Sequence, residues 1–103
     1  MPRAVEESGQ FKEFYQTRYA SARVAPGGYV YNVLTNVDRR GEGHGTELMR
    51  QITADADRLR MPLTLHARTE LHPWYQRLGF EHVDDDFDDW GGTSMPRLRR
   101  EPR

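Results

Sequence analysis

The stretch Tyr29–Leu59, YVYNVLTNVDRRGEGHGTELMRQITADADRL, decides the fold of this sequence. Its beginning is rich in β-branched and aromatic residues and ends at turn residues, which predicts a strand over Tyr29–Val37. A polar loop with three glycines at alternate positions follows. A helix is then expected from Thr46, because its apolar residues fall on one face; these are Leu48, Met49, Ile52, Ala56 and Leu59. A strand, a glycine-rich loop and a helix in this order indicate an α/β domain.

The loop reads Arg40-x-x-Gly43-x-Gly45 directly before the helix. A helix N-terminus offers unpaired N–H groups and partial positive charge, and glycines let the backbone approach an anion. The loop is therefore a candidate phosphate or pyrophosphate site, with an ordinary tight turn as the alternative. A P-loop is excluded because the loop has no lysine, and the dinucleotide fingerprint needs a glycine or alanine where Thr46 stands.

After the helix, Leu63–Ala67 (LTLHA) reads as a strand parallel to the first, because a helical crossover joins the two. A short helix is expected next, with Pro73 at its first position and Gly79 at its C-terminal cap. Phe80 is placed to pack back on the last turn of that helix.

The flanking segments are less regular. Phe80–Val83 predicts a third strand and Thr93–Arg99 a last edge strand, where a proline is tolerated. Residues 1–10 have no apolar period and are expected to be flexible. Aromatic residues at helical spacing predict a helix over Phe11–Ala22, with an edge strand as the alternative.

Composition narrows the function classes. The chain has 103 residues, which indicates one domain over residues 1–103, and a net charge of −1 from 15 basic and 16 acidic residues. This balance argues against a general binder of nucleic acid or of membrane surfaces. The sequence has no cysteine, which excludes disulfides, thiol catalysis and cysteine-based zinc sites. It has no apolar run of membrane-spanning length and no signal-peptide core, so we expect a cytoplasmic protein.

A second segment, His72–Phe80 (HPWYQRLGF), contains Tyr-x-x-x-Gly-Phe. Together with the glycine loop about 30 residues earlier, it resembles the GNAT (Gcn5-related) N-acetyltransferase superfamily, over residues 28–100. The resemblance implies a mixed α/β (α+β) fold. Its sheet would be mostly antiparallel, with a central splayed pair of parallel strands and flanking helices. The implied activity is acetyl transfer from acetyl-CoA to a primary amine, with no metal.

The resemblance also implies a binding mode for acetyl-CoA. The pyrophosphate would lie on loop and helix N–H groups beside the Arg40 side chain; these groups belong to Gly41, Gly43, His44, Gly45 and Thr46. The pantetheine arm would pair with backbone groups near Asn36 and Val37. The thioester would enter the gap between the two parallel strands, where a backbone N–H of the first strand would stabilise the oxyanion.

Two side chains are implied for catalysis. Tyr75 occupies the family's general-acid position, since a tyrosine keeps its proton at pH 7 and can give it to the departing thiolate. A helix tyrosine that only packs in the core is the alternative. His66 lies near the expected splay, and histidine is a common general base, which makes it a candidate for that role. A merely hydrogen-bonded histidine is the alternative, and His72, Glu70 and Asp38 are weaker candidates.

The sequence departs from the family in several ways. Tyr29–Val37 lacks the glutamate that many relatives use as base, and the spacing from Val37 to Arg40 is about two residues short. Arg68 stands where many relatives have an asparagine. The missing glutamate keeps open a non-catalytic module that binds acetyl-CoA or a protein. The short N-terminal region suggests that a homodimer completes the acceptor site. The aspartates of 84–89 are either a solvated surface run or a region that attracts a cationic amine. The arginine-rich C-terminal end is either solvated or a contact for nucleic acid.

Overall fold

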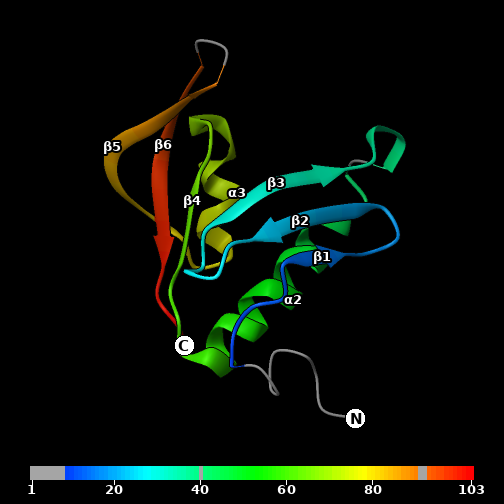
Figure 1. Ribbon diagram of the computed structural model, residues 1–103. Coiled ribbons are helices and arrows are strands. Elements are labelled where there is room, and N and C mark those ends of the chain that lie inside the picture. The colour runs from blue at the N-terminus through cyan, green and yellow to red at the C-terminus, as the bar shows by residue number, and fades with distance from the viewer. Residues whose placement is uncertain (1–8, 40, 91–92) are drawn as a thin grey trace.

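The computed structural model describes residues 9–39, 41–90 and 93–103 (Figure 1). Its elements in chain order are β1 (Phe14–Gln16), β2 (Ala20–Val24), β3 (Val30–Thr35), η1 (Val37–Arg39), α2 (His44–Leu59), β4 (Leu63–His66), η2 (Thr69–Leu71), α3 (His72–Arg77), β5 (Glu81–Trp90) and β6 (Thr93–Arg100). The strands form two antiparallel sheets, ordered β1-β2-β3 and β4-β6-β5. None of the described helices has the length and apolar character needed to cross a bilayer.

The two sheets meet at one place. A single parallel bridge joins Tyr29 to Thr64, and the Thr64 N–H donates to Gly28 O at 3.0 Å. Beyond this bridge β3 and β4 diverge, with α3 behind them (Figure 1). The mostly antiparallel sheet with a splayed parallel pair is confirmed, although the expected parallel pairing is reduced to this one bridge. We call Gly28, Tyr29, Pro62 and Thr64 the joint.

The N-terminal segment is a hairpin, so the predicted helix over Phe11–Ala22 is wrong and its strand alternative is confirmed. Burial alternates along β2, where Ala20, Ala22 and Val24 face the core. In β1, Tyr15 is buried while Phe14 is 44% exposed. The spacing of Phe11, Tyr15 and Tyr19 fits a helix, but it fits the two-residue period of a strand equally well, and Phe14 falls on the opposite, exposed face. Residues 1–8, expected to be flexible, lie outside the described residues.

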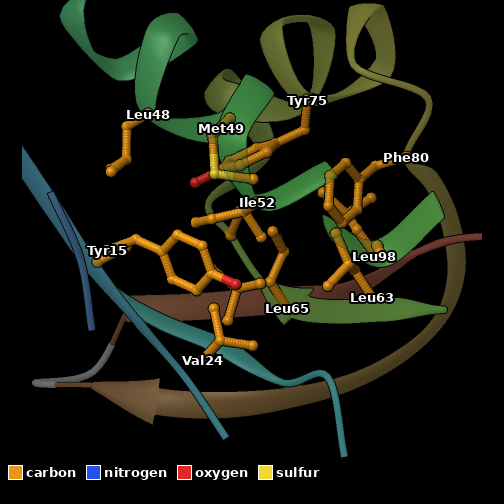
Figure 2. Close-up of a cluster of buried hydrophobic side chains, with 14 of the residues drawn as sticks. Tyr15, Val24, Leu48, Met49, Ile52, Leu63, Leu65, Tyr75, Phe80 and Leu98 are labelled. Atoms are coloured by element: carbon orange, nitrogen blue, oxygen red, sulfur yellow. The ribbon is translucent and has the colours of Figure 1, made fainter. Parts of the chain in front are cut away.

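The core lies between α2 and the two sheets (Figure 2). The predicted apolar face of α2 is buried at Leu48, Met49, Ile52 and Ala56. Strand and loop residues close the core from the other side; they include Val24, Leu63, Leu65, Phe80 and Leu98. The helix begins at His44, two residues before the predicted start, because Gly43 in a left-handed conformation ends the loop.

One polar residue of α2 lies in this core against expectation. Asp55 is only 3% exposed, and the Tyr15 hydroxyl donates to its Oδ2 atom at 2.6 Å. Arg58 forms an ion pair with the other carboxylate oxygen. Because a buried carboxylate is costly without partners, these two contacts account for its place and fasten β1 to α2.

The C-terminal sheet differs most from expectation. β6 lies between β4 and β5, so its predicted edge position is wrong. Pro96 is tolerated inside this sheet because the β5–β6 register shifts between Asp84 and Phe87, opposite the residue that has no N–H. β5 extends far beyond the predicted Phe80–Val83, and the acidic run therefore lies within a strand.

The short helix α3 has the predicted start and end residues, with one change. It begins at His72, so Pro73 takes the second position rather than the first. Gly79 has a φ of 98°, and its N–H donates to Gln76 O at 3.0 Å. The N–H of Phe80 donates to Tyr75 O at 3.1 Å, and its ring contacts the Tyr75 ring edge-on. This C-terminal cap is the one predicted, and it fixes Tyr75 against the core.

Candidate functional site

A groove of about 760 Å³ opens where β3 and β4 diverge. It is lined by β3, by the loop and start of α2, and by the segment from Arg68 into α3; the residues are Val33, Leu34, Thr35, Gly41, Gly43, His44, Gly45, Thr46, Arg68, Leu71, Trp74 and Tyr75. Two segments predicted to act together, the glycine loop and the Tyr-x-x-x-Gly-Phe helix, therefore face one another across it.

The glycine end of the groove is open backbone. Gly41 and Gly43 have φ values of 85° and 86°, and among the described residues nothing beyond the chain neighbours lies within 4 Å of where a Cβ would stand on either. Gly43 is the N-cap of α2 and provides no side-chain cap, so the first N–H groups of the helix are left for another acceptor. This cradle fits a phosphate group. Arg40, predicted beside it, lies outside the described residues.

Gly45 has a different role from the other two glycines. A Cβ there would lie 3.3 Å from Thr35 Oγ1 and 3.4 Å from Trp74 Cζ2, so its lack of a side chain lets α2, β3 and α3 pack closely. Trp74 Nε1 donates to Thr46 Oγ1 at 3.0 Å. Sequence reasoning missed Trp74, although its place beside Tyr75 in the HPWYQRLGF segment is a signal that points to it.

Asn36 and Val37 lie beyond the groove's lining. The Asn36 N–H donates to Tyr19 O at 2.7 Å, and its carbonyl accepts from the Arg39 N–H at 2.9 Å, so both backbone groups are already used. Val37 belongs to the 3-10 turn η1. The β3 residues that do line the groove come slightly earlier, at Val33–Thr35. The pantetheine contact of Asn36 and Val37 stays a prediction.

Tyr75 lies at the inner end of the groove. It is 5% exposed, and burial raises the pKa of its hydroxyl to about 12. The rings of Trp74 and Phe80 pack against its ring at centroid distances of 4.7 and 5.7 Å. The side chain is thus fixed in place and protonated at neutral pH.

A narrow passage of about 180 Å³ leads from the groove through the divergence of β3 and β4. It shares Val33, Arg68, Leu71 and Tyr75 with the groove. It adjoins a second cavity of about 700 Å³, the far pocket; the lining residues of the far pocket are Tyr29, Val30, Tyr31, Asn32, Val33, His66 and Met95. The groove, passage and far pocket therefore adjoin in this order and share lining residues.

β3 is irregular where it borders the passage. Asn32 has a φ of 54°, rare for a residue with a side chain, and the β2–β3 register shifts at this point. Such a bulge takes backbone groups out of the regular ladder and turns them aside. A bulge beside a passage therefore offers N–H donors to a group held there.

His66 borders the passage and the far pocket, close to the joint. Its Nδ1 atom lies 2.6 Å from the Tyr29 hydroxyl, and its Nε2 atom is shielded from solvent. The structure thus brings both predicted catalytic residues, Tyr75 and His66, to the lining of the same passage. Sequence reasoning missed Tyr29, which holds the imidazole from the neighbouring strand.

The weaker candidates are engaged elsewhere. His72 Nε2 lies 2.9 Å from Ala67 O, and Glu70 lies 3.9 Å from Arg68. Within the described part of the chain, no three histidine or acidic side chains are grouped to hold a metal ion. The arginines near the C-terminus pair with acids: Arg97 with Asp84, Arg99 with Glu101 and Arg100 with Asp57. The hydrogen bond from Arg100 lowers the pKa of Asp57.

Known structures share this architecture. An acyl-CoA N-acyltransferase from Pseudomonas aeruginosa is 27% identical, with a TM-score of 0.70 over 80% of this chain and 60% of that one. Bacillus subtilis YlbP, an N-acetyltransferase solved with coenzyme A, is 15% identical, with a TM-score of 0.65 over 87% and 68%. Arabidopsis thaliana Naa50, solved with a bisubstrate analogue of coenzyme A, is 17% identical, with a TM-score of 0.65 over 81% and 65%.

The chain thus spans between 60% and 68% of the length of these three proteins. No curated protein matches the sequence. The model of the acetyltransferase (GNAT) domain matches residues 5–96, which is most of the chain. This match, the shared fold and the opposed glycine loop and α3 agree, and the chain belongs to the GNAT acetyltransferase family.

Proposed function

We propose that the protein transfers an acetyl group from acetyl-CoA to a primary amine by direct attack in a ternary complex. The observation that carries this proposal is that the groove, passage and far pocket adjoin, with Tyr75 bordering both groove and passage. A donor entering by the groove and an acceptor entering by the far pocket would meet beside a fixed proton donor. Acetyl-CoA supplies the activated thioester.

The groove residues would hold the donor. The N–H groups at Gly41–Thr46 would bind the pyrophosphate, joined by the predicted Arg40, since the cradle is open and carries the positive end of α2. β3 is an edge strand beyond the joint, so its backbone at Val33–Thr35 is placed to pair with the pantetheine arm. This puts the arm slightly earlier on β3 than Asn36 and Val37.

The reaction then follows from the passage. His66 takes a proton from the acceptor ammonium, and the freed amine attacks the thioester carbonyl. N–H groups of the bulge at Asn32 and Val33 stabilise the oxyanion that forms. When this tetrahedral intermediate collapses, the new C–N bond stays and the C–S bond breaks. Tyr75 then donates its proton to the departing thiolate. Tyr75 recovers a proton from the amide nitrogen or from solvent, so amide, thiol and one released proton balance the step.

The properties of Tyr75 suit this role. A thiol has a pKa of about 8.5 and the buried Tyr75 hydroxyl a pKa of about 12, so Tyr75 keeps its proton until the thiolate develops beside it. Transfer from the weaker acid is uphill, and it is completed because the thiol then leaves and the tyrosinate recovers a proton. The acid therefore acts late in the step, when the C–S bond is already breaking.

The test is release of free thiol from acetyl-CoA in the presence of single primary amines. Amine-dependent release that falls in the Tyr75→Phe variant supports the transferase. Tight binding of acetyl-CoA without release across a broad amine panel would establish the alternative, a non-catalytic acetyl-CoA-binding module of the same fold.

A further inference from the structure

The wall of the far pocket is aromatic. Tyr29, directly before β3, and Tyr31 within it are two residues apart and line the same pocket, with ring centroids 6.4 Å apart and planes inclined by 28°. Tyr31 is 37% exposed, which leaves part of its ring open to a ligand. Val33 and Met95 extend the apolar surface. Two nearly parallel rings beside aliphatic side chains make a surface that suits an aromatic or branched-alkyl group.

The described part of this lining carries no fixed charge. None of its described residues is Asp, Glu, Lys or Arg, and the one titratable imidazole is held by the Tyr29 hydroxyl. A charged substituent placed next to the reacting amine would lose water here without gaining an ionic partner from these residues, which is costly. An apolar substituent would instead gain by leaving water.

The dimensions divide an acceptor into two parts. The passage is about 180 Å³ and the far pocket about 700 Å³. The passage has room for an amino group and its adjoining carbon beside His66, while the far pocket has room for a ring-sized group. The group attached nearest to the amine must therefore lie against Tyr29 and Tyr31.

We propose that the acceptor is a primary amine whose nearest substituent is an aromatic or branched-alkyl group, and that Tyr31 determines this specificity. The inference rests on the proposed acetyl transfer. A polycationic acceptor is the competing outcome, because Asp88 pairs in register with Met95, which lines the far pocket. The side chains of residues 85–90 lie outside those described.

The test measures binding as well as turnover. The protein saturated with coenzyme A is titrated with 2-phenylethylamine and, separately, with butane-1,4-diamine, while backbone amide signals are followed by NMR. We expect 2-phenylethylamine to shift the signals of Tyr31, Val33 and His66 and to bind about tenfold more tightly than the diamine. Tyr31→Ala should remove most of this preference, and Tyr31→Phe should keep it. Phe14→Ala, at an exposed ring on β1, should leave it unchanged.

Equal or tighter binding of the diamine would overturn the proposal, most directly if Asp88→Asn removed it. Shifts that map away from the far pocket would overturn it as well. Failure of coenzyme A to shift the signals of Gly41–Thr46 would count against acetyl transfer itself. In that case the same amine titration of the protein alone still decides the preference of the far pocket, so the two failures are distinguishable.

Discussion

The groove and the far pocket lie on opposite sides of one passage and are built by opposite means. The end of the groove that we propose to hold phosphate is backbone: glycines with left-handed φ values and the start of α2. The far pocket is side chain, projected from alternate positions of β3 and from β4 and β6. A backbone site is damaged by adding atoms, whereas a side-chain site is damaged by removing them. The first suits a ligand group that never varies, and the second suits one that differs between proteins.

The largest effect on activity is expected at the passage, which lies between the groove and the far pocket. Tyr75→Phe removes the proton donor of the passage and should lower kcat for amine acetylation about 10³-fold, while acetyl-CoA still binds. Thiol release measures the first quantity and calorimetry the second. Tyr15→Phe is the matched control, since it removes a buried hydroxyl that does not border the passage and should lower stability only. An unchanged kcat in Tyr75→Phe would remove the acid from the mechanism.

The joint connects the two sheets that build the groove and the far pocket. A substitution in the joint should give the next largest effect, which is on stability. In Gly28→Ala a Cβ would stand 2.4 Å from Pro62 O at a φ of 88°, so the joint must open. We expect a loss of about 3 kcal/mol in the free energy of unfolding, from clash and backbone strain together. Gly27→Ala, with nothing within 4 Å and no positive φ, is the control and should change it little. Urea unfolding of both variants checks the difference.

His66→Gln should affect turnover at the passage and far pocket but not donor binding in the groove. Loss of the base should lower kcat at pH 7 about 10²-fold while the Kd of acetyl-CoA stays unchanged. Tyr29→Phe, which leaves the imidazole without its hydroxyl partner, should have a smaller effect and alter the pH profile of kcat. If His66→Gln weakened acetyl-CoA binding as much as turnover, the separation of the two regions would be wrong.

Alkaline pH tests the burial of Tyr75 itself. Because its folded-state pKa is raised to about 12 from 10.0, its contribution to stability is complete below pH 10 and is lost as pH rises toward 12. Denaturant unfolding should show a fall of about 2 kcal/mol from this group over that interval. Tyr15, whose pKa is also raised by burial, adds to the fall, so Tyr75→Phe should reduce it without abolishing it.

The groove alone should respond to Gly43→Ala. An alanine at a φ of 86° is strained and brings a methyl group into the phosphate cradle, so we expect about tenfold weaker binding of coenzyme A. Gly9→Ala provides the matched control, because Gly9 has a φ of 68° and open surroundings but does not line the groove. Both variants should lose similar stability, and only the first should lose affinity. Calorimetric titration with coenzyme A distinguishes them.

The parts of the molecule that the sequence predicted are those determined by near neighbours. The glycine loop, the apolar face of α2 and the Gly79 cap each follow from a few consecutive residues. The N-terminal hairpin was mispredicted because its aromatic spacing satisfies two periods, and only packing against α2 selects one of them. The central place of β6 was missed for the same reason, since strand order depends on partners far away in the chain.

The candidate site divides in the same way. The loop residues Gly41–Thr46 and the general-acid candidate Tyr75 were found from motifs, and they do line one groove. The Tyr29–His66 contact and the aromatic wall were not found, because they arise where β3 and β4 diverge. No spacing along the chain encodes that divergence.

The order β4-β6-β5 has a consequence for how the protein is made. Leu63 and Leu65 of β4 emerge from the ribosome well before Leu98 and Arg100 of β6, with which the strand pairs. Apart from the bridge at the joint, the N-terminal sheet offers β4 no ladder. During synthesis β4 is therefore exposed before its hydrogen-bonding partner β6 has been made. Nascent chains in such a state aggregate or recruit chaperones. The second sheet closes only when the last strand arrives.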